Sequence, residues 1–335
     1  MKKFFLVVLL LVLVAGVGGF FFLPEYLSDT HHANEVELIV QSGGTLTSIG
    51  NKLYEDGVIK SKIWFRLQGE EIATSIKPGT YRIPVGATIE DIYELIQIGE
   101  QEVPVIITFP EGYILYQFAQ KVEEAGFGSM NDFILATEEY FNENYSNVVN
   151  SEELYFNLEG YLFPDTYHFS SKQTMKDIVT KLVKTMESQW TEDMYQKMNG
   201  LDLTKHQVLT IASLIEREAY NDEERERISG VIYNRIKSGM LLQIDATVIY
   251  GIGEGKEHMT RVLYADLERQ NPFNTYLNLG IPPGPIASPG KNSIMAALNP
   301  EDHDYYFYVL GENGHVFAKT YQEHLRNVEN YRNSN

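Results

Sequence analysis

An unbroken apolar run at the N-terminus constrains this chain more than any other feature. Twenty residues, Phe4 to Leu23, carry no charge, and Lys2 and Lys3 precede them. A helix of that length covers about 30 Å, the thickness of the hydrocarbon core of a bilayer. Lysines that flank a membrane span favour the cytoplasmic side. We therefore expect a single-pass protein of the cell membrane, with residues 1–3 in the cytoplasm, a transmembrane anchor over 4–23 and the remaining residues outside the cytoplasm.

A cleaved signal peptide is the competing interpretation of the same run. Signal peptides have a shorter apolar region that ends in small residues, and the residues from Ala15 to Gly19 imitate such a cleavage site. The apolar stretch nevertheless continues past them through Phe20 to Leu23. This continuation favours the uncleaved anchor.

The composition excludes several classes of protein. The chain has 335 residues, 46 acidic and 27 basic side chains, a formal charge of −19 and no cysteine. An acidic chain without a long basic run is a poor electrostatic match to nucleic acid, so no nucleic-acid partner is expected. Without cysteine there is no disulfide, thiol nucleophile or cysteine-ligated zinc. The length suggests about two domains.

Beyond a polar tether at residues 24–35, one pattern occurs three times. Each copy has a short strand-like run, a glycine turn and apolar residues at helical spacing. The strand-like runs are Val36 to Val40, Thr80 to Ile83 and Val103 to Phe109. We predict an α+β fold with a small α/β module over 36–102 and a larger mixed α+β domain over 103–335. The pattern leaves open whether these copies only pack or also bind a ligand.

Helices dominate after Met130, and an aromatic, turn-rich segment from Leu158 to Tyr167 interrupts them. Aromatic residues mixed with carboxylates suit a sugar-binding wall, but this composition favours a buried loop.

The C-terminal region is predicted to be scaffold. Asn313 and Gly314 are typical of a hairpin turn, and Thr320 with Glu323 caps a final helix. His303, His315 and His324 lie nearby, but their spacing matches no known ligand pattern, so neither a metal nor another cofactor is expected.

One helix in the second half carries candidate catalytic groups. Thr204 and Gln207 form a capping box ahead of apolar positions that run from Val208 to Ala219. At about 100° per residue, Glu216 and Glu218 lie about 80° to either side of the apolar face. A carboxyl group at such a rim is partly desolvated, which raises its pKa and lets it hold a proton near neutral pH. The alternative is that both belong to a solvated, charged helix surface.

The residues that follow are typical of polymer recognition. A second helix ends at Ser238 and Gly239 with Asn234 and Arg235 near its end, and we expect the buried Arg235 to have a carboxylate partner such as Glu218 or Asp245. An extended segment is predicted over 243–250, and a Pro/Gly-rich loop over 280–290 is expected to shape a wall. The polar residues of this region are mostly amides and hydroxyls, which suit a neutral carbohydrate. The candidates are Gln243, Asp245, Thr247, Tyr250, Asn274, Thr275 and Tyr276.

Several ordered motifs together resemble the YceG-like (MltG) family of endolytic murein transglycosylases. The matching segments are Pro110 to Gly112, Leu158 to Tyr167, Ala212 to Glu218, Val231 to Arg235, Leu242 to Gly251, Asn274 to Tyr276 and Gly280 to Pro289. Gly44, Thr45 and Leu46 also resemble the start of a LysM module, a small fold that binds N-acetylated glycans. The resemblance covers nearly the whole chain, and it implies a LysM-like module over 36–102 and a YceG-like catalytic domain over 103–335.

The resemblance implies a carbon–oxygen lyase that cuts between N-acetylmuramic acid and N-acetylglucosamine without adding water. The family's catalytic glutamate falls on Glu216. The resemblance implies that it acts first as general acid towards the glycosidic oxygen and then as general base towards the muramic C6 hydroxyl. That hydroxyl closes on C1 and gives a 1,6-anhydro end. By similarity, the candidates for substrate contact are Asn234, Gln243, Asp245, Asn274 and Tyr276. Glu218 is interpreted as a structural or orienting neighbour and as a further candidate for substrate contact.

Two other functions stay open. A hydrolytic muramidase on the same scaffold needs two carboxylates about 5 to 9.5 Å apart, and Glu218 is not an obvious partner of Glu216 because the two lie about 160° apart around the helix. The second open function is a catalytically inactive glycan-binding scaffold that recruits membrane-bound cell-wall synthases. The partners implied are peptidoglycan strands, the membrane and such synthases.

Overall fold

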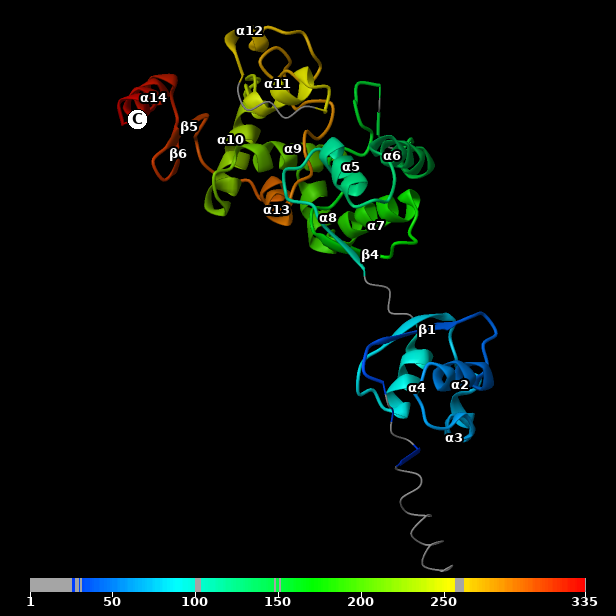
Figure 1. Ribbon diagram of the computed structural model, residues 1–335. Helices are drawn as coiled ribbons and strands as arrows, with labels where there is room; N and C mark the ends of the chain where they lie inside the picture. Colours follow the sequence, from blue (N-terminus) through cyan, green and yellow to red (C-terminus); the bar gives the residue numbers. More distant parts are fainter. Residues whose placement is uncertain are drawn as a thin grey trace, which may run out of the picture. The chain divides into compact units, whose positions relative to one another are not determined.

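The computed structural model describes residues 26–27, 30, 32–99, 104–147, 149–150, 152–256 and 262–334. The predicted cytoplasmic tip, the predicted anchor over 4–23 and part of the predicted tether lie outside these residues. Within them, no helix combines the length and the apolar character that a membrane span requires. The chain divides into two compact units between Val103 and Pro104, and Figure 1 labels most of their elements. The fold is mixed α+β, as predicted.

The first unit pairs β1 (Val36–Val40) with β2 (Gly79–Ile83) in an antiparallel ribbon. Its helices are α2 (Leu46–Glu55), α3 (Lys62–Gln68), the 3-10 turn η1 (Glu70–Ile72) and α4 (Ile89–Ile98). Capping boxes at Thr45 and Thr88 begin α2 and α4 directly after the glycine turns. The apolar faces of the ribbon and the helices form one core that includes Leu38, Ile83 and Ile89. The first two predicted strand, turn and helix units are therefore confirmed.

The second unit begins with the third predicted unit of this kind and continues as a helical body. The strand β3 (Val105–Thr108) pairs antiparallel with β4 (Thr166–Phe169). The helices are α5 (Leu115–Glu124), α6 (Met130–Asn144), α7 (Met175–Ser188), α8 (Glu192–Gly200), α9 (Lys205–Glu218), the 3-10 turn η2 (Asp222–Glu224), α10 (Arg225–Lys237), α11 (Asp245–Ile252), α12 (Tyr264–Leu267) and α13 (Lys291–Leu298). The predicted C-terminal hairpin is present as β5 (Phe307–Gly311) and β6 (Gly314–Ala318), followed by α14 (Tyr321–Ser334).

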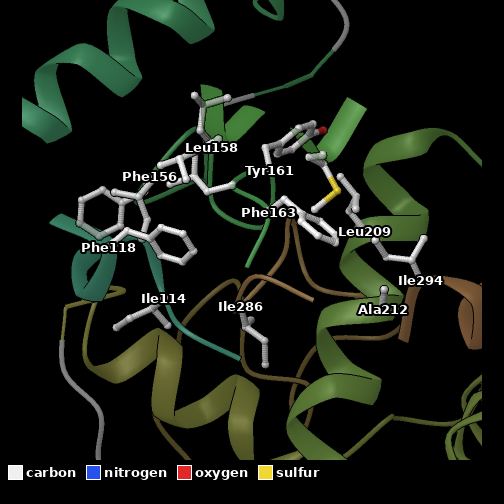
Figure 2. Close-up of a cluster of buried hydrophobic side chains, with 14 of the residues drawn as sticks. Ile114, Phe118, Phe156, Leu158, Tyr161, Phe163, Leu209, Ala212, Ile286 and Ile294 are labelled. Carbon is white, nitrogen blue, oxygen red and sulfur yellow. The ribbon is translucent and has the colours of Figure 1, made fainter. Parts of the chain in front are cut away.

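The core of the second unit surrounds α9, which begins at the predicted capping box of Thr204 and Gln207. Every residue from Val208 to Ile215 is buried, and α13 packs against the same helix. Figure 2 shows Tyr161 and Phe163 in this core with Leu209 and Ala212 of α9. Most of the segment from Leu158 to Tyr167 is buried, which confirms the buried-loop interpretation over the sugar-binding wall.

The predicted extended segment over 243–250 is wrong, because α11 occupies most of it. Gln243 has a left-handed backbone with φ of 50°, which turns the chain before the helix. The Thr247 hydroxyl then donates to the Ile244 carbonyl and anchors the first turn. The β-branched residues of this stretch favour a strand locally, but the interior packing of Thr247 and Val248 outweighs that preference.

Candidate functional site

The last turn of α9 carries two glutamates into different environments. Glu218 is the final helical residue, because Ala219 adopts an extended conformation with φ of −68° and ψ of 128°. The predicted angle of about 160° between Glu216 and Glu218 sends their carboxyl groups to opposite sides of this turn.

Glu216 lies at a junction between α9, α10 and α13. Its Oε1 is 3.2 Å from Nη1 of Arg225, and both side chains are almost fully buried. Its Oε2 accepts the backbone N–H of Gly290 at 2.9 Å. Burial and the charge of Glu216 together raise the pKa of the neighbouring Glu111 carboxyl. Both oxygens of Glu216 are therefore engaged in holding these helices together.

The Pro/Gly-rich loop supports α9 from the same side. Besides the contact of Gly290 with Glu216, the backbone N–H of Ile286 donates to Oγ of Ser213 at 3.0 Å. None of the residues from Ile281 to Pro289 lines the cleft described next. The loop holds the helix in place, and its role in shaping a substrate-binding wall stays a prediction.

Glu218 faces a cleft of about 330 Å³ on the other side of α9. Its Oε2 accepts the hydroxyl of Tyr308 at 2.8 Å. Burial raises the pKa of Glu218 to about 7. The charge of Asp245 also raises this pKa, whereas the hydrogen bond from Tyr308 lowers it. A carboxyl group with a pKa near 7 is present in both protonation states at neutral pH, which suits general acid and base chemistry.

The cleft brings together residues from α9, α10, the turn before α11 and its first residue, the loop between α12 and α13, and the C-terminal hairpin and helix. Its lining consists of Glu218, Arg235, Leu242, Gln243, Asp245, Tyr276, Phe307, Tyr308, Tyr321 and His324. Four of the predicted substrate-contact residues are among them: Glu218, Gln243, Asp245 and Tyr276. The hydroxyl of Tyr276 donates to Oδ1 of Asp245 at 2.6 Å, so the cleft contains a second tyrosine–carboxylate pair.

Two other predicted residues, Asn234 and Asn274, do not line the cleft. The Asn234 amide donates to the carbonyls of His303 and Tyr305 at 2.8 and 3.1 Å. Asn274 is 1% exposed, and its amide donates to the carbonyls of Leu267 and Arg269. Both side chains satisfy backbone acceptors of irregular loops, so they position the cleft's walls from behind.

Arg235 lines the cleft without the carboxylate partner that we expected. Its Nε donates to the Tyr306 carbonyl at 2.6 Å, and its Nη1 donates to the carbonyls of Leu241 and Leu242. Within the described part of the chain, no carboxylate oxygen lies within ion-pair distance of Arg235. Three carbonyl acceptors stabilise the buried guanidinium instead.

The C-terminal region is more than the scaffold that we predicted, because four of its side chains line the cleft. These are Phe307, Tyr308, Tyr321 and His324. The hairpin is tied to η2 by Glu224, which accepts both the ring Nδ1–H of His315 at 2.7 Å and its backbone N–H at 3.0 Å. The sequence signal for this wall was the density of aromatic residues beside the predicted hairpin turn.

The three C-terminal histidines have separate environments. His303 contacts the carbonyl of Arg227 through Nε2, His315 contacts Glu224, and His324 lines the cleft. Over the residues that the structure describes, no group of three or more His, Cys, Asp or Glu side chains is arranged to hold a metal ion.

Comparison with known proteins identifies relatives of this chain. An "Endolytic murein transglycosylase" of Bacillus subtilis is 34% identical over 330 residues, which cover 94% of this chain and 91% of that protein. A protein of the same name from Streptococcus pneumoniae is 29% identical over 98% of this chain, which spans 65% of that relative's length.

A solved structure and a family profile agree with these relatives. The crystal structure of a YceG-like protein from Listeria monocytogenes is 30% identical to this chain and covers 88% of it, and the match spans 99% of that protein with a TM-score of 0.61. The profile of the YceG-like family matches residues 38–330. The chain therefore belongs to the YceG-like family.

Proposed function

We propose that this protein is an endolytic murein transglycosylase that cuts the bond between N-acetylmuramic acid and N-acetylglucosamine within peptidoglycan strands. The names of the bacillary and streptococcal relatives support the reaction class. The observation that carries the proposal is the position of Glu218, a carboxyl group with a pKa of about 7 at the surface of a polar cleft.

We assign the acid and base role to Glu218 in place of Glu216. Both carboxylate oxygens of Glu216 are engaged by Arg225 and by the backbone of Gly290. These contacts point the Glu216 carboxylate into the junction of α9, α10 and α13, and Glu216 does not line the cleft. Glu218 lies beside Gln243, Asp245 and Tyr276, and those amide, carboxylate and hydroxyl groups suit the hydroxyls and N-acetyl groups of a sugar.

One carboxyl group serves both steps of the reaction. Protonated Glu218 donates its proton to the glycosidic oxygen as the bond between C1 and that oxygen breaks. The resulting carboxylate then accepts the proton of the muramic C6 hydroxyl, whose oxygen forms the new bond to C1. The carboxyl group regains its proton, no water is consumed, and the products are a free hydroxyl end and a 1,6-anhydro end.

Hydrolysis by the same cleft is the second candidate, and the presence of Asp245 favours it. Asp245 supplies a second carboxylate in the cleft of Glu218, whereas Glu216 does not. A hydrolase would use this carboxylate as nucleophile or to activate water. In the transglycosylase, the pair of Asp245 and Tyr276 orients the sugar.

The test is product analysis with purified, peptide-free glycan strands and three proteins: the wild type, Glu218→Gln and Glu216→Gln. We expect the wild type to release ends that are one water lighter than reducing ends, as read by mass spectrometry. Glu218→Gln should lose at least about a hundredfold in rate, because the amide donates no proton. Glu216→Gln keeps the cleft and should retain most of the rate while it unfolds at lower temperature.

Each alternative has its own outcome in this experiment. Reducing ends from the wild type, lost in Asp245→Asn, would establish hydrolysis. Loss of cleavage in folded Glu216→Gln with retention in Glu218→Gln would restore Glu216 as the acid. A wild type that binds strands without cutting them would indicate the non-catalytic scaffold.

We further propose that the protein is anchored in the cell membrane by residues 4–23, with the catalytic unit outside the cytoplasm. The uncharged run and the two preceding lysines support this topology. Deletion of 4–23 should leave cleavage of soluble strands intact and impair cellular function, because the cleft is no longer held near new strands and membrane-bound synthases. Full rescue by a freely secreted form would contradict the anchoring role. The LysM-like nature of residues 36–102 stays a prediction.

A further inference from the structure

Three aromatic rings of the C-terminal region meet at one side of the cleft. Phe307 comes from β5, whereas Tyr321 and His324 come from the first turn of α14, drawn orange to red in Figure 1. The ring centroids of Phe307 and His324 are 5.5 Å apart with an interplanar angle of 26°. Those of Phe307 and Tyr321 are 5.8 Å apart. All three rings line the cleft that holds Glu218, and we call them the aromatic platform.

The platform is not explained by packing of the core. Tyr321 is 61% exposed, although a tyrosine that served the core would bury most of its ring. Phe307 is the supported member, because the guanidinium of Arg235 lies 5.2 Å from its ring centroid and the imidazole of His324 stacks against it. Arg235 and the stacked rings thus hold the platform in place, while Tyr321 remains open to a ligand.

His324 adds a second observation that points to a ligand. Its Nδ1 is buried and has no hydrogen-bond partner in the described part of the structure. Burial and the nearby Arg235 lower the pKa of His324, which favours the uncharged ring. An uncharged imidazole beside two aromatic rings presents an apolar ring face to the cleft.

The cleft is therefore lined by two chemically different sets of groups. One set contains the acidic and amide groups of Glu218, Asp245 and Gln243, and the other is the platform. A pyranose ring matches such a cleft, because its C–H groups pack against aromatic rings while its hydroxyls reach polar groups. A purely apolar ligand would leave the polar set unmatched, and a small ion would leave the platform unmatched.

We propose that Phe307, Tyr321 and His324 form a sugar-stacking subsite that holds the saccharide next to the bond being cut. The proposal rests on the proposed function for the identity of the polymer. Because the platform binds a sugar that does not react, it contributes to binding in the ground state and the transition state alike. Its removal should then raise KM and leave kcat nearly unchanged.

The experiment uses the full chain in the Glu218→Gln background for binding and in the wild-type background for kinetics. The ligand is purified, peptide-free glycan strands, and binding is measured by calorimetry. Tyr321→Ala and His324→Ala should each raise Kd and KM by about tenfold, with kcat within about twofold. Tyr321→Phe keeps the ring and should bind within about twofold of its parent. Leu325→Ala is the matched control, because Leu325 is exposed on the same helix but does not line the cleft.

Three results would overturn the subsite. Tyr321→Ala and His324→Ala with the Kd of the parent would remove the platform from binding. A loss in Tyr321→Phe as large as in Tyr321→Ala would replace ring stacking by a hydroxyl contact. Equal loss in Leu325→Ala would point to damage of α14, which thermal melting checks independently. A wild type that binds strands through Tyr321 but never cuts them would keep the subsite and refute the proposed function, whereas normal cleavage and binding by Tyr321→Ala would do the reverse.

Discussion

The carboxyl group of Glu159 makes the stability of the second unit depend on pH. Glu159 is 3% exposed, and both of its oxygens accept the backbone N–H of Leu115 at the start of α5. The hydroxyl of Tyr250 in α11 donates to the same carboxyl group at 3.3 Å. Burial raises the pKa of Glu159 from 4.5 to about 8, and these hydrogen bonds only partly oppose it.

The sign of the pH dependence follows from this shift. Because the pKa is higher in the folded state, folding holds a proton that the unfolded chain releases. The stabilising contribution of Glu159 is complete below pH 4.5 and is lost as pH rises through about 8. Between pH 5 and pH 7, the free energy of unfolding should fall by about 2 kcal/mol from this group. In Glu159→Gln a neutral amide replaces the protonated acid, so this loss is absent.

Urea unfolding at pH 5, 6 and 7 measures the effect. The chain has two tryptophans, and Trp190 belongs to the core of the second unit while Trp64 packs in the first. In a Trp64→Phe background, fluorescence then reports the second unit alone. Relative to the protein with Glu159, the free energy of unfolding of Glu159→Gln should rise by about 2 kcal/mol between pH 5 and pH 7. A difference that stays constant over this range would refute the argument, because Glu159 would then be ionised in the folded state.

Further predictions concern the cleft, the hairpin and the helix cap. Tyr308→Phe removes a hydrogen bond that lowers the pKa of Glu218, so the alkaline limb of the pH–rate profile for strand cleavage should move upward; an unshifted limb would exclude Glu218 as the acid. His315→Ala leaves the buried carboxyl of Glu224 without its ring partner and should lower the free energy of unfolding by about 2 kcal/mol in urea titrations, whereas an effect below experimental error would mean that the hairpin is held by other contacts. Thr204→Ala removes the N-cap of α9 and should cost about 1 kcal/mol in the same assay, and no change there would show that core packing alone fixes the start of the helix.

Local signals in the sequence were sufficient for the elements that begin and end with a polar cap or a tight turn. Thr204 and Gln207 marked the start of α9, and Asn313 with Gly314 marked the hairpin of β5 and β6. The helical angle correctly placed Glu216 and Glu218 on different sides. These features depend on residues within a few positions of one another, so one sequence contains them.

The environments of the two glutamates depend on distant residues and could not be read from the helix. The partners of Glu216 are Arg225 and the backbone of Gly290, which lies 74 residues away in the sequence. The hydroxyl of Tyr308 donates the hydrogen bond to Glu218. Arg235 was misjudged for the same reason, since carbonyls of irregular loops replaced the expected carboxylate. The helix α11 and the aromatic platform both depend on tertiary packing, so no local pattern in the sequence predicts them.

The hydrogen bond between Glu218 and Tyr308 also sets an order of assembly during synthesis. Ninety residues of chain separate the two partners, and the platform residue Tyr321 follows later still. A ribosome that has finished α9 and α10 has therefore made Glu218 but only part of the cleft that it lines. A chain cut short before β5 would carry Glu218 without the hydroxyl of Tyr308 and without the aromatic platform. The complete cleft therefore forms only after the C-terminal hairpin and helix have been made, and a partly made chain lacks it.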